Sequence, residues 1–423
     1  MRRLICFLIA LPLSAQTPQV KLTLEQAEAI AVKNNPDVSF ALLTAAAANQ
    51  VTLEVRSAFL PTVYGNLTGV GALSGSTISA GSLTNSSVYS RIGAGVAAGQ
   101  LISDFGRTSN LTASARLHAE GRANAAKATR AEIILQTDRA FYSALRAASV
   151  LKVATETVSA RQTVADQVGA LANANLKSGL DVSFANVNLS DAKLLLLSSQ
   201  NDLRAAYADL SAALGSRDQQ TYELVEPASL GAPPADPAPL ILSSLQARPD
   251  AQSARSEYNS ALKFTAAEAD LKKPTVSALA SAGAVPEHAE QLRDRYLAAG
   301  VNVSVPIFNG HLFGARQSEA EFRAQAQAQA LRSLENRIAH DVTTAVLNAG
   351  TAYQRLSLTA ELVQQATLAL DLAQARYNLG LSSIVELSQA QLNLTSAQIA
   401  GSSAEFDYDL QRAVLDYQMG VVR

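Results

Sequence analysis

The side chains most able to coordinate a metal or to transfer a proton are few and scattered along the chain. The histidines show none of the short spacings that metal sites use. They are His118, His288, His311 and His340. No serine, cysteine or lysine occurs in a pattern that pairs a nucleophile with a base and an orienting group. The sequence therefore predicts no catalytic residue, no metal site and no cofactor, and we expect that the protein is not an enzyme.

One acidic side chain, Glu386, lies in the most strongly patterned stretch of the chain, residues 376–394. Gly380 is suited to end one helix, and Ser382 and Ser383 are suited to cap the next, so this stretch predicts a tight helical hairpin. The same pattern is expected in residues 176–182, which include Gly179 and Asp181. An acid in the first turn of a helix is favoured by the helix dipole alone. Each carboxylate therefore has an ordinary structural explanation beside any functional one.

Composition excludes one class of partner. The 423 residues carry a net charge of −2 at pH 7, and only 17% of them are charged. So small a net charge gives no electrostatic attraction to nucleic acid, which binds basic surfaces. We therefore expect no nucleic-acid partner. The length of the chain suits two or three ordinary domains.

Residues 1–15 have the composition of a secretory signal peptide. Arg2 and Arg3 precede an apolar segment, 4–13, and two small residues follow it as a cleavage site. The single cysteine, Cys6, lies in this segment, so we expect no disulfide in the exported chain. No later segment is apolar over the length that a transmembrane helix needs. If the protein lies in a membrane, strands are expected to cross it.

Two pairs of strands are expected, at about 62–102 and 275–307. Apolar residues alternate with polar residues or glycines in each strand, which is the period of a sheet with two different faces. Each strand has about ten residues, the length of a tilted strand that crosses a bilayer. The Gly-, Ser- and Thr-rich residues 74–87 are predicted to form a solvent loop. A soluble β-sheet would show the same alternation.

Long helices are expected beside the strands. No proline interrupts residues 107–177, and one helix of this length would measure on the order of 100 Å. The following helix has large residues at every seventh position and small residues three places after each of them, a pattern that lets helices approach closely. The large residues are Val182, Leu189, Leu196, Leu203 and Leu210, and the small ones are Ala185, Ala192, Ser199, Ala206 and Ala213. A strict seven-residue repeat indicates a left-handed supercoil, as in any antiparallel coiled coil.

The second half of the chain repeats the first. Asn34-Asn-Pro-Asp37 has a counterpart in Ala247-Arg-Pro-Asp250, and the last helix keeps the register of the earlier one, so that Ala185 matches Ala390. We predict a first repeat at 16–215, a proline-rich linker at 216–239 with only short extended pieces, and a second repeat at 240–423.

These elements predict an internally duplicated, mainly α-helical protein with a membrane β-barrel completed by several copies. Four strands cannot close a barrel alone. An open sheet edge in lipid would leave backbone groups unsatisfied, at several kcal/mol each. Three copies would supply twelve strands, enough to enclose an aqueous pore.

Together these features resemble the TolC family of outer-membrane efflux proteins. The similarity covers about residues 22–420, and it is carried by residues 22–61, the strand pairs, the junction Gln100–Arg107 and the hairpin at Tyr377-Asn-Leu-Gly380. The resemblance implies a homotrimer with a twelve-stranded β-barrel in outer-membrane lipid and an α-helical barrel in the periplasm. It also implies a periplasmic adaptor (membrane fusion) protein and an inner-membrane pump of the RND, ABC or MFS class. The implied function is export of small molecules or proteins, by efflux or by type I secretion.

By the same resemblance, a gate lies at the periplasmic hairpin tips. Glu386 takes the position of an acidic ring that narrows the closed duct, and Gln389 replaces a second acid of that ring. Tyr377 and Asp181 match residues that latch neighbouring coils, and Ser382 stands where the basic partner of the latch would be. A ring of Glu386 carboxylates would favour cations. The alternative is that Glu386 is a solvated hairpin carboxylate.

The tips of the hairpins are also the expected docking surface for the adaptor, with Gly179, Gly380 and Leu381 at their ends. A second interpretation of the whole chain is a periplasmic coiled-coil adaptor or scaffold. Adaptors usually have one helical hairpin between small β domains, whereas two hairpins and two strand pairs are expected here. The sequence therefore favours the duct.

Overall fold

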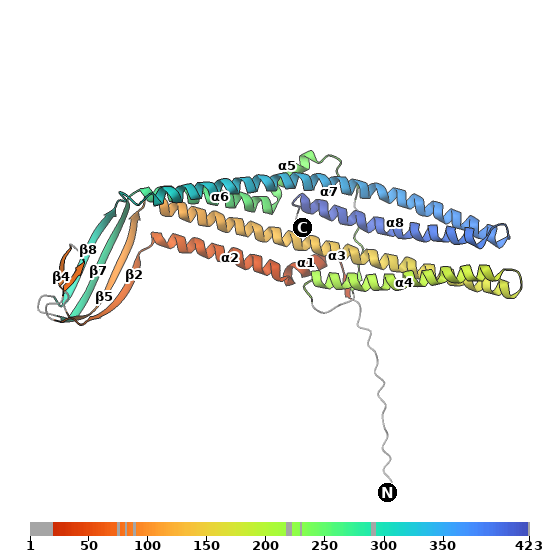
Figure 1. Cartoon of the computed structure of the whole chain (residues 1–423), viewed down its shortest axis with the longest axis horizontal. Coiled ribbons are helices and arrows are strands. Elements are labelled where there is room, and N and C mark those ends of the chain that lie inside the picture. The colour runs from red at the N-terminus through yellow and green to blue at the C-terminus, as the bar shows by residue number, and fades with distance from the viewer. Residues whose placement is uncertain are drawn as a thin grey trace, which may run out of the picture.

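The computed structural model describes residues 20–73, 77–80, 83–87, 90–216, 222–228, 231–288 and 293–421. The predicted signal peptide, 1–15, lies outside these residues together with Cys6. The molecule is elongated, with a β-sheet at one end and the tips of two long helical hairpins at the other (Figure 1). The short helix α1 (Leu24–Asn34) lies near the middle of its length.

The sheet contains the two predicted strand pairs. Its strands are β2 (Thr62–Val70), β5 (Arg91–Ser103), β7 (Thr275–His288) and β8 (Arg295–Ser304). They pair antiparallel in the order β2-β5-β7-β8, so one pair from each half of the chain forms a single sheet. The prediction of four strands in two pairs is confirmed, although β8 ends at Ser304 and the expectation extended it to 307.

The strand register gives this sheet one apolar face. Leu67 on β2 lies opposite Ala94, and Leu297 on β8 lies opposite Ala282. The same face carries Val63, Ile92, Val96, Val276, Val301 and Val303. The opposite face carries mainly glycine, serine, threonine and asparagine in the same registers. The two faces therefore differ in chemistry across all four strands.

Residues 74–87 correct one expectation. Within this predicted loop, β3 (Thr77–Ala80) and β4 (Leu83–Ser87) pair antiparallel, whereas residues 74–76, 81 and 82 lie outside the described residues. Threonine has a high strand propensity, and a two-stranded ribbon needs no apolar face to satisfy its backbone. The sequence did not predict these two strands because the glycines and serines of residues 74–87 also favour turns.

The predicted linker, 216–239, also contains more structure than expected. Residues 222–224 form β6 (Tyr222–Leu224), which pairs in parallel with β1 (Val20–Leu22), and α5 (Ala238–Ala247) begins before the linker ends. Residues 217–221, 229 and 230 lie outside the described residues. The parallel pairing joins two segments that are far apart in the sequence. The boundaries of the predicted repeats remain predictions.

The helices occur in the same order in each half. The first half has α2 (Pro36–Arg56), α3 (Arg107–Asn173) and α4 (Gly179–Ala213). The second has α6 (Pro249–Ala269), α7 (Leu312–Asn378) and α8 (Ile384–Gln418). Both α3 and α7 have 67 residues, and both α4 and α8 have 35. A short 3₁₀ turn follows α2 at Ser57–Phe59 and α6 at Asp270–Lys272.

The small residues of the predicted heptads lie at the helix contacts. Ala185, Ala192, Ser199 and Ala206 of α4 are buried, as are Ala390, Ala397 and Ala404 of α8. Leu194 and Leu197, which belong to neither seam, are exposed. Small side chains let the backbones of neighbouring helices approach closely, which accounts for the long parallel course of the hairpins.

Helix α2 corrects the expectation that no helix could cross a membrane. Its segment Pro36–Phe59 is long and apolar enough to do so by length and composition, with a mean hydropathy of 1.3, and 17% of it is buried. One side of α2 packs on α3, whereas Phe40, Leu42 and Leu43 are exposed. The sequence analysis did not identify this segment as long and apolar enough, because its alanines raise the mean hydropathy without forming an uninterrupted run of large apolar residues.

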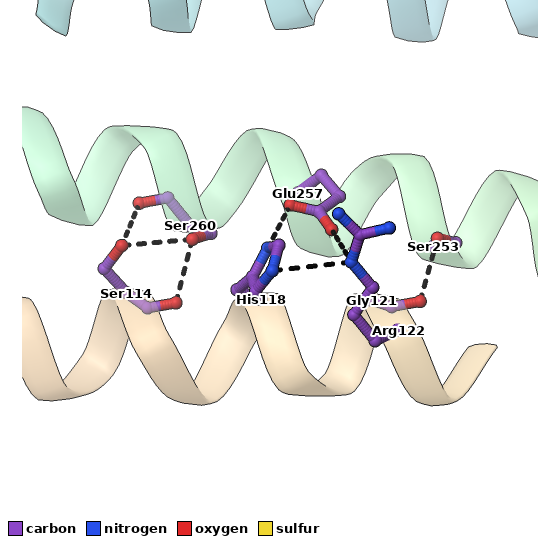
Figure 2. A network of polar contacts seen from close by, with 7 residues as sticks. All are labelled: Ser114, His118, Gly121, Arg122, Ser253, Glu257 and Ser260. Carbon is purple, nitrogen blue, oxygen red and sulfur yellow. Dashed lines mark hydrogen bonds and ion pairs between the residues drawn. The ribbon is translucent and has the colours of Figure 1, made fainter. Parts of the chain in front are cut away.

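A seam of polar contacts joins α3 of the first half to α6 of the second (Figure 2). Ser114 Oγ donates to the Ser260 carbonyl over 2.9 Å, and Ser260 Oγ donates to the Ser114 carbonyl over 2.8 Å. Glu257 lies 2.8 Å from His118 Nδ1 and 3.7 Å from Arg122 Nε. Because Arg122 Nε donates to His118 Nε2 over 3.4 Å, the hydrogen on this ring is assigned to Nδ1, which donates to Glu257.

Candidate functional site

The candidate site is formed by the two hairpin tips, which lie side by side at one end of the molecule (Figure 1). In the second hairpin, Gly380 has φ +73°, and the Leu381 N–H donates to the Arg376 carbonyl over 2.8 Å. This is a Schellman end, in which a left-handed residue satisfies the last helical carbonyls. The prediction that Gly380 ends this helix is confirmed.

The first hairpin turns at a different residue from the one the sequence suggested. Asn175, with φ +60°, is left-handed, and the Leu176 N–H donates to the Leu171 carbonyl over 2.8 Å. Asn175 is thus the counterpart of Gly380, and Gly179 is the first residue of α4. Asparagine tolerates the left-handed region better than most residues. This tolerance is the feature by which the sequence could have identified Asn175 as the turn residue of the first hairpin.

Helix caps set the directions of α4 and α8. Ser178 Oγ accepts from the Asp181 N–H over 3.2 Å, and Asp181 Oδ2 accepts from the Ser178 N–H over 3.0 Å, which completes a capping box. In the second hairpin, Ser383 Oγ accepts from the Glu386 N–H over 3.4 Å. Of the two predicted capping serines, Ser383 forms this bond. The Ser382 hydroxyl is buried and has no hydrogen-bond partner among the described residues.

Asp181 is held in its ionised form by this cap. Hydrogen bonds from Ser178 lower the pKa of the Asp181 carboxyl, and Lys177 lowers it further. Hydrogen bonds to a carboxylate favour the charged form. Its position and cap are those of an ordinary first-turn acid, as the dipole argument allowed.

Tyr377 lies at the centre of the contact between the hairpins. Its side chain is 4% exposed and belongs to an apolar cluster with Val168, Leu189, Ile384 and Leu387. Burial, followed by the nearby negative charge of Asp181, raises the pKa of the Tyr377 hydroxyl. That hydroxyl has no hydrogen-bond partner among the described residues, a rare state for a buried polar group.

Two contacts that the sequence did not reveal hold the hairpins together. Lys177 Nζ lies 3.8 Å from the centre of the Tyr377 ring, within the range of a cation–π interaction. Asn188 Nδ2 donates to Ser388 Oγ over 2.6 Å. Each contact joins the first hairpin to the second. Their partners are about 200 residues apart, so no local pattern could have paired them.

Glu386 is a partly exposed side chain with a cationic partner. Its Oε1 lies 3.4 Å from Arg376 Nε, across the turn between α7 and α8. One turn further along α8, Gln389 Nε2 donates to Asn393 Oδ1 over 2.9 Å. The sequence singled out Glu386 and Gln389 but not Arg376, whose pairing depends on how α7 and α8 meet.

The described residues of the tips offer hydrogen bonding, charge and apolar packing. Among the described residues, no group of three or more His, Cys, Asp and Glu side chains could hold a metal ion. The described histidines lie on different elements. For example, His118 belongs to the α3–α6 seam, whereas His288 lies beside Asp294.

A family model described as "Outer membrane efflux protein" matches residues 29–216 and 240–421. The chain is 23% identical over 300 residues to the outer membrane protein TolC of Salmonella enteritidis, covering 69% of this chain and 61% of that protein. The Escherichia coli (strain K12) TolC is also 23% identical, over 303 residues, covering 69% and 62%. The chain thus matches less than two thirds of the length of either relative.

Solved structures share the fold over nearly the whole chain. A structure of CusC superposes with a TM-score of 0.83 at 18% identity and covers 95% of this chain and 93% of that one. VceC from Vibrio cholerae gives 0.80 at 18% identity, covering 94% and 96%. The open state of the Neisseria gonorrhoeae MtrE outer membrane channel gives 0.76 at 20% identity, covering 94% and 88%. The matched family model covers both halves, and the chain therefore belongs to the outer membrane efflux protein family and is a protein of the outer membrane.

Proposed function

We propose that three copies of this chain form an exit duct across the outer membrane and periplasm. The observation that carries the proposal is the four-stranded sheet, which is apolar on one face and has β2 and β8 as its edges. In lipid, the unpaired backbone groups of an edge strand cost several kcal/mol each. Pairing β8 of one copy with β2 of the next removes these edges. Three copies then give twelve strands around a pore, with the apolar face toward lipid.

The helices support a second barrel in the periplasm. α3, α4, α7 and α8 run away from the sheet and end together at the tips (Figure 1). Copies arranged around one axis would continue the pore through a wall of helices. The exposed apolar side chains of α2, which include Phe40, Leu42 and Leu43, would then pack against a neighbouring copy. Burying such side chains is favourable at about 25 cal/mol per Å².

The partners and cargo in this proposal are those of a tripartite exporter. A periplasmic adaptor would bind the hairpin tips around Gly179, Gly380 and Leu381. An inner-membrane RND, ABC or MFS pump would supply small molecules or, in type I secretion, proteins. Family membership and the channels with the same fold support this role. The alternative function, a free periplasmic adaptor, does not account for a sheet that is open at both edges and apolar on one face.

The tips would form the gate of this duct. Glu386 and Gln389 would face the axis, and the Arg376 partner of Glu386 would offset much of the negative charge of the ring. Tyr377, Asp181 and Ser382 would belong to the latch. Ser382 is neutral and supplies no cation to the latch. Lys177, which lies over the Tyr377 ring, would supply one beside it.

Disulfide crosslinking tests the closure of the barrel. Asn66→Cys on β2 is combined in turn with Ala298→Cys, Gly300→Cys or Asn302→Cys on β8, because the register between copies is not fixed in advance. Within one chain the edge strands are three strand spacings apart, about 14 Å, which is too far for a disulfide. Oxidised membranes should therefore yield a covalent trimer for at least one pair.

Each single-cysteine variant is the matched control and should remain monomeric in denaturing gels. The proposal is wrong if every double variant also remains monomeric, or if the protein is recovered as a soluble periplasmic monomer. A covalent dimer without trimer would contradict closure by three copies.

A further inference from the structure

A cavity of about 450 Å³ lies at mid-length, away from both the sheet and the hairpin tips. Its walls come from α1, α3, α8 and the segment 225–228, so both halves of the chain contribute (Figure 1). Apolar walls are formed by Leu24, Ile134, Leu135, Val225, Pro227 and Ala413. This volume and lining are typical of small-molecule sites.

The polar part of the lining has a single charge sign. It includes the carboxylates Glu25, Glu28, Asp138, Glu226, Asp409 and Asp416. No lysine, arginine or histidine belongs to the described lining. Two aromatic side chains, Tyr142 and Tyr417, complete it. Carboxylates beside aromatic and apolar walls suit a cation that carries an apolar body.

Asp409 points to a ligand independently of this cluster. It is 8% exposed, and it lines both this cavity and a neighbouring one of about 660 Å³. Its carboxylate accepts no hydrogen bond and forms no ion pair within the described part of the chain. Asp407, two residues earlier on α8, instead lies 3.3 Å from Arg146. A buried carboxylate without a partner is unfavourable, and a bound cation would remove that cost.

We propose that this cavity binds an amphipathic organic cation, whose ammonium group pairs with Asp409 while its apolar body packs between α1 and α3. The site includes no residue of the sheet or of the hairpin tips. Because its walls come from both halves, an occupant would also stabilise the contact of α1 and the segment 225–228 with α8. Helix α8 carries Glu386 near its opposite end.

The test measures binding to the purified, detergent-solubilised protein, in whatever oligomeric state it has, by isothermal titration calorimetry at pH 8. The probe is 4-phenylbutylamine, and its neutral and anionic analogues are 4-phenylbutanol and 4-phenylbutyrate. Titration into detergent alone corrects for partition into micelles. The amine should bind at least tenfold more tightly than the alcohol, and the carboxylate should show no binding.

Two variants locate the site. Asp409→Asn keeps the shape of the side chain and should weaken amine binding at least tenfold without changing the affinity for the alcohol. Ala413→Phe fills the cavity without changing a charge and should abolish binding of both. Asp407→Asn is the matched control, because it removes an acid from the same helix outside the cavity, and it should leave amine binding unchanged.

Equal affinities for amine and alcohol would overturn the proposal, as would unchanged amine binding in Asp409→Asn or Ala413→Phe. An equal loss in Asp407→Asn would show that surface charge, rather than the cavity, attracts the amine. Each variant is first shown to form the same oligomer as the parent, and Ala413→Phe keeps the test decisive if Asp409→Asn does not assemble. Failure of the exit-duct proposal would appear in the crosslinking experiment and not in this one.

Discussion

At the scale of single residues, burial and pairing change side chains that look alike in the sequence. Asp407 and Asp409 are both acids on α8, yet Asp407 is paired with Arg146, whereas Asp409 is buried without a partner among the described residues. Burial, followed by the charge of Glu405, raises the pKa of Asp409 to about 6. Glu386, which we expected to be either a ring acid or a solvated carboxylate, has a cationic partner within its own hairpin.

The raised pKa of Asp409 predicts how stability varies with pH. The folded value of about 6 exceeds the ordinary 3.8, so the folded state binds the proton more tightly. Ionised Asp409 therefore destabilises the fold above pH 6, by at most about 3 kcal/mol, and this cost disappears as the pH falls below 4. Asp409→Asn should raise the thermal unfolding midpoint at pH 8 and leave it unchanged at pH 3.5. A lower midpoint at pH 8 would contradict the assignment.

The Arg376–Glu386 pair predicts the ion selectivity of the proposed duct. Arg376→Gln leaves the Glu386 carboxylates without their cationic partners, so cation preference should increase severalfold. Glu386→Gln should lower it, and the double variant should lie between the two. Reversal potentials in planar bilayers under a KCl gradient measure these changes. Glu361→Gln, on the exposed surface of α7, is the control, and identical potentials for Arg376→Gln and the parent would refute the charge offset.

At the scale of elements, contacts between distant segments determine the fold. The seam in Figure 2 joins α3 to α6, and the parallel pair β1–β6 joins the start of the described chain to the predicted linker. In the sheet, Tyr296 on β8 lies across Gly283 on β7 and Gly95 on β5, where a Cβ would overlap the tyrosine hydroxyl. Gly283 on the adjacent strand and Gly95 one strand further therefore make room for the Tyr296 side chain.

This packing predicts a context-dependent cost of adding one methyl group. Gly95→Ala should destabilise the oligomer by roughly 1–3 kcal/mol, because the Tyr296 ring and the neighbouring backbone must move. Combined with Tyr296→Ala, the same change should cost less than about 0.5 kcal/mol, a coupling typical of residues in contact. Gly65→Ala is the control in the same sheet, since nothing lies within 4 Å of its added Cβ. Thermal dissociation of the oligomer is measured for the parent, the two single variants, the double variant and the control. Equal losses from Gly95→Ala with and without Tyr296 would disprove the contact.

At the scale of the whole molecule, one sheet with two different faces and two long hairpins leave surfaces that the proposed trimer would cover. The apolar face of the sheet and the exposed side of α2 are both uncovered in one chain. Lipid suits the first, and a neighbouring copy suits the second. The cavity at mid-length belongs to the single chain and does not depend on assembly.

Two neighbouring alanines on β8 test which face of the sheet meets lipid. Ala299 shares the face of Leu297 and Val301, whereas Ala298 lies on the opposite face with Tyr296 and Gly300. Ala299→Arg should cost about 2–4 kcal/mol in the bilayer and reduce the amount of oligomer in the outer membrane. Ala298→Arg should assemble normally, because its side chain would face the water-filled pore of the proposed duct. Equal yields of the two variants would contradict the proposed orientation.

The sequence alone determined the elements that depend on local patterns. Alternation predicted the four main strands, the absence of proline predicted the length of α3, and the heptads predicted which small residues of α4 and α8 are buried. Gly380 was predictable because few other residues adopt a left-handed helix end. These features depend on neighbours within a few positions of the chain.

The tertiary structure alone decided the pairings between distant residues. How separate helices meet decides the contacts of Lys177 with Tyr377 and of Arg376 with Glu386. It also decides that Asp409 is buried without a partner among the described residues. No spacing in the sequence encodes these arrangements. The β1–β6 pair and the β3–β4 hairpin were not predicted. The three residues of β1 and of β6 are too few to show a period, and β3 and β4 have few large apolar residues. Local patterns specify elements, whereas burial and pairing depend on three-dimensional neighbours, and it is burial and pairing that distinguish one carboxylate from another.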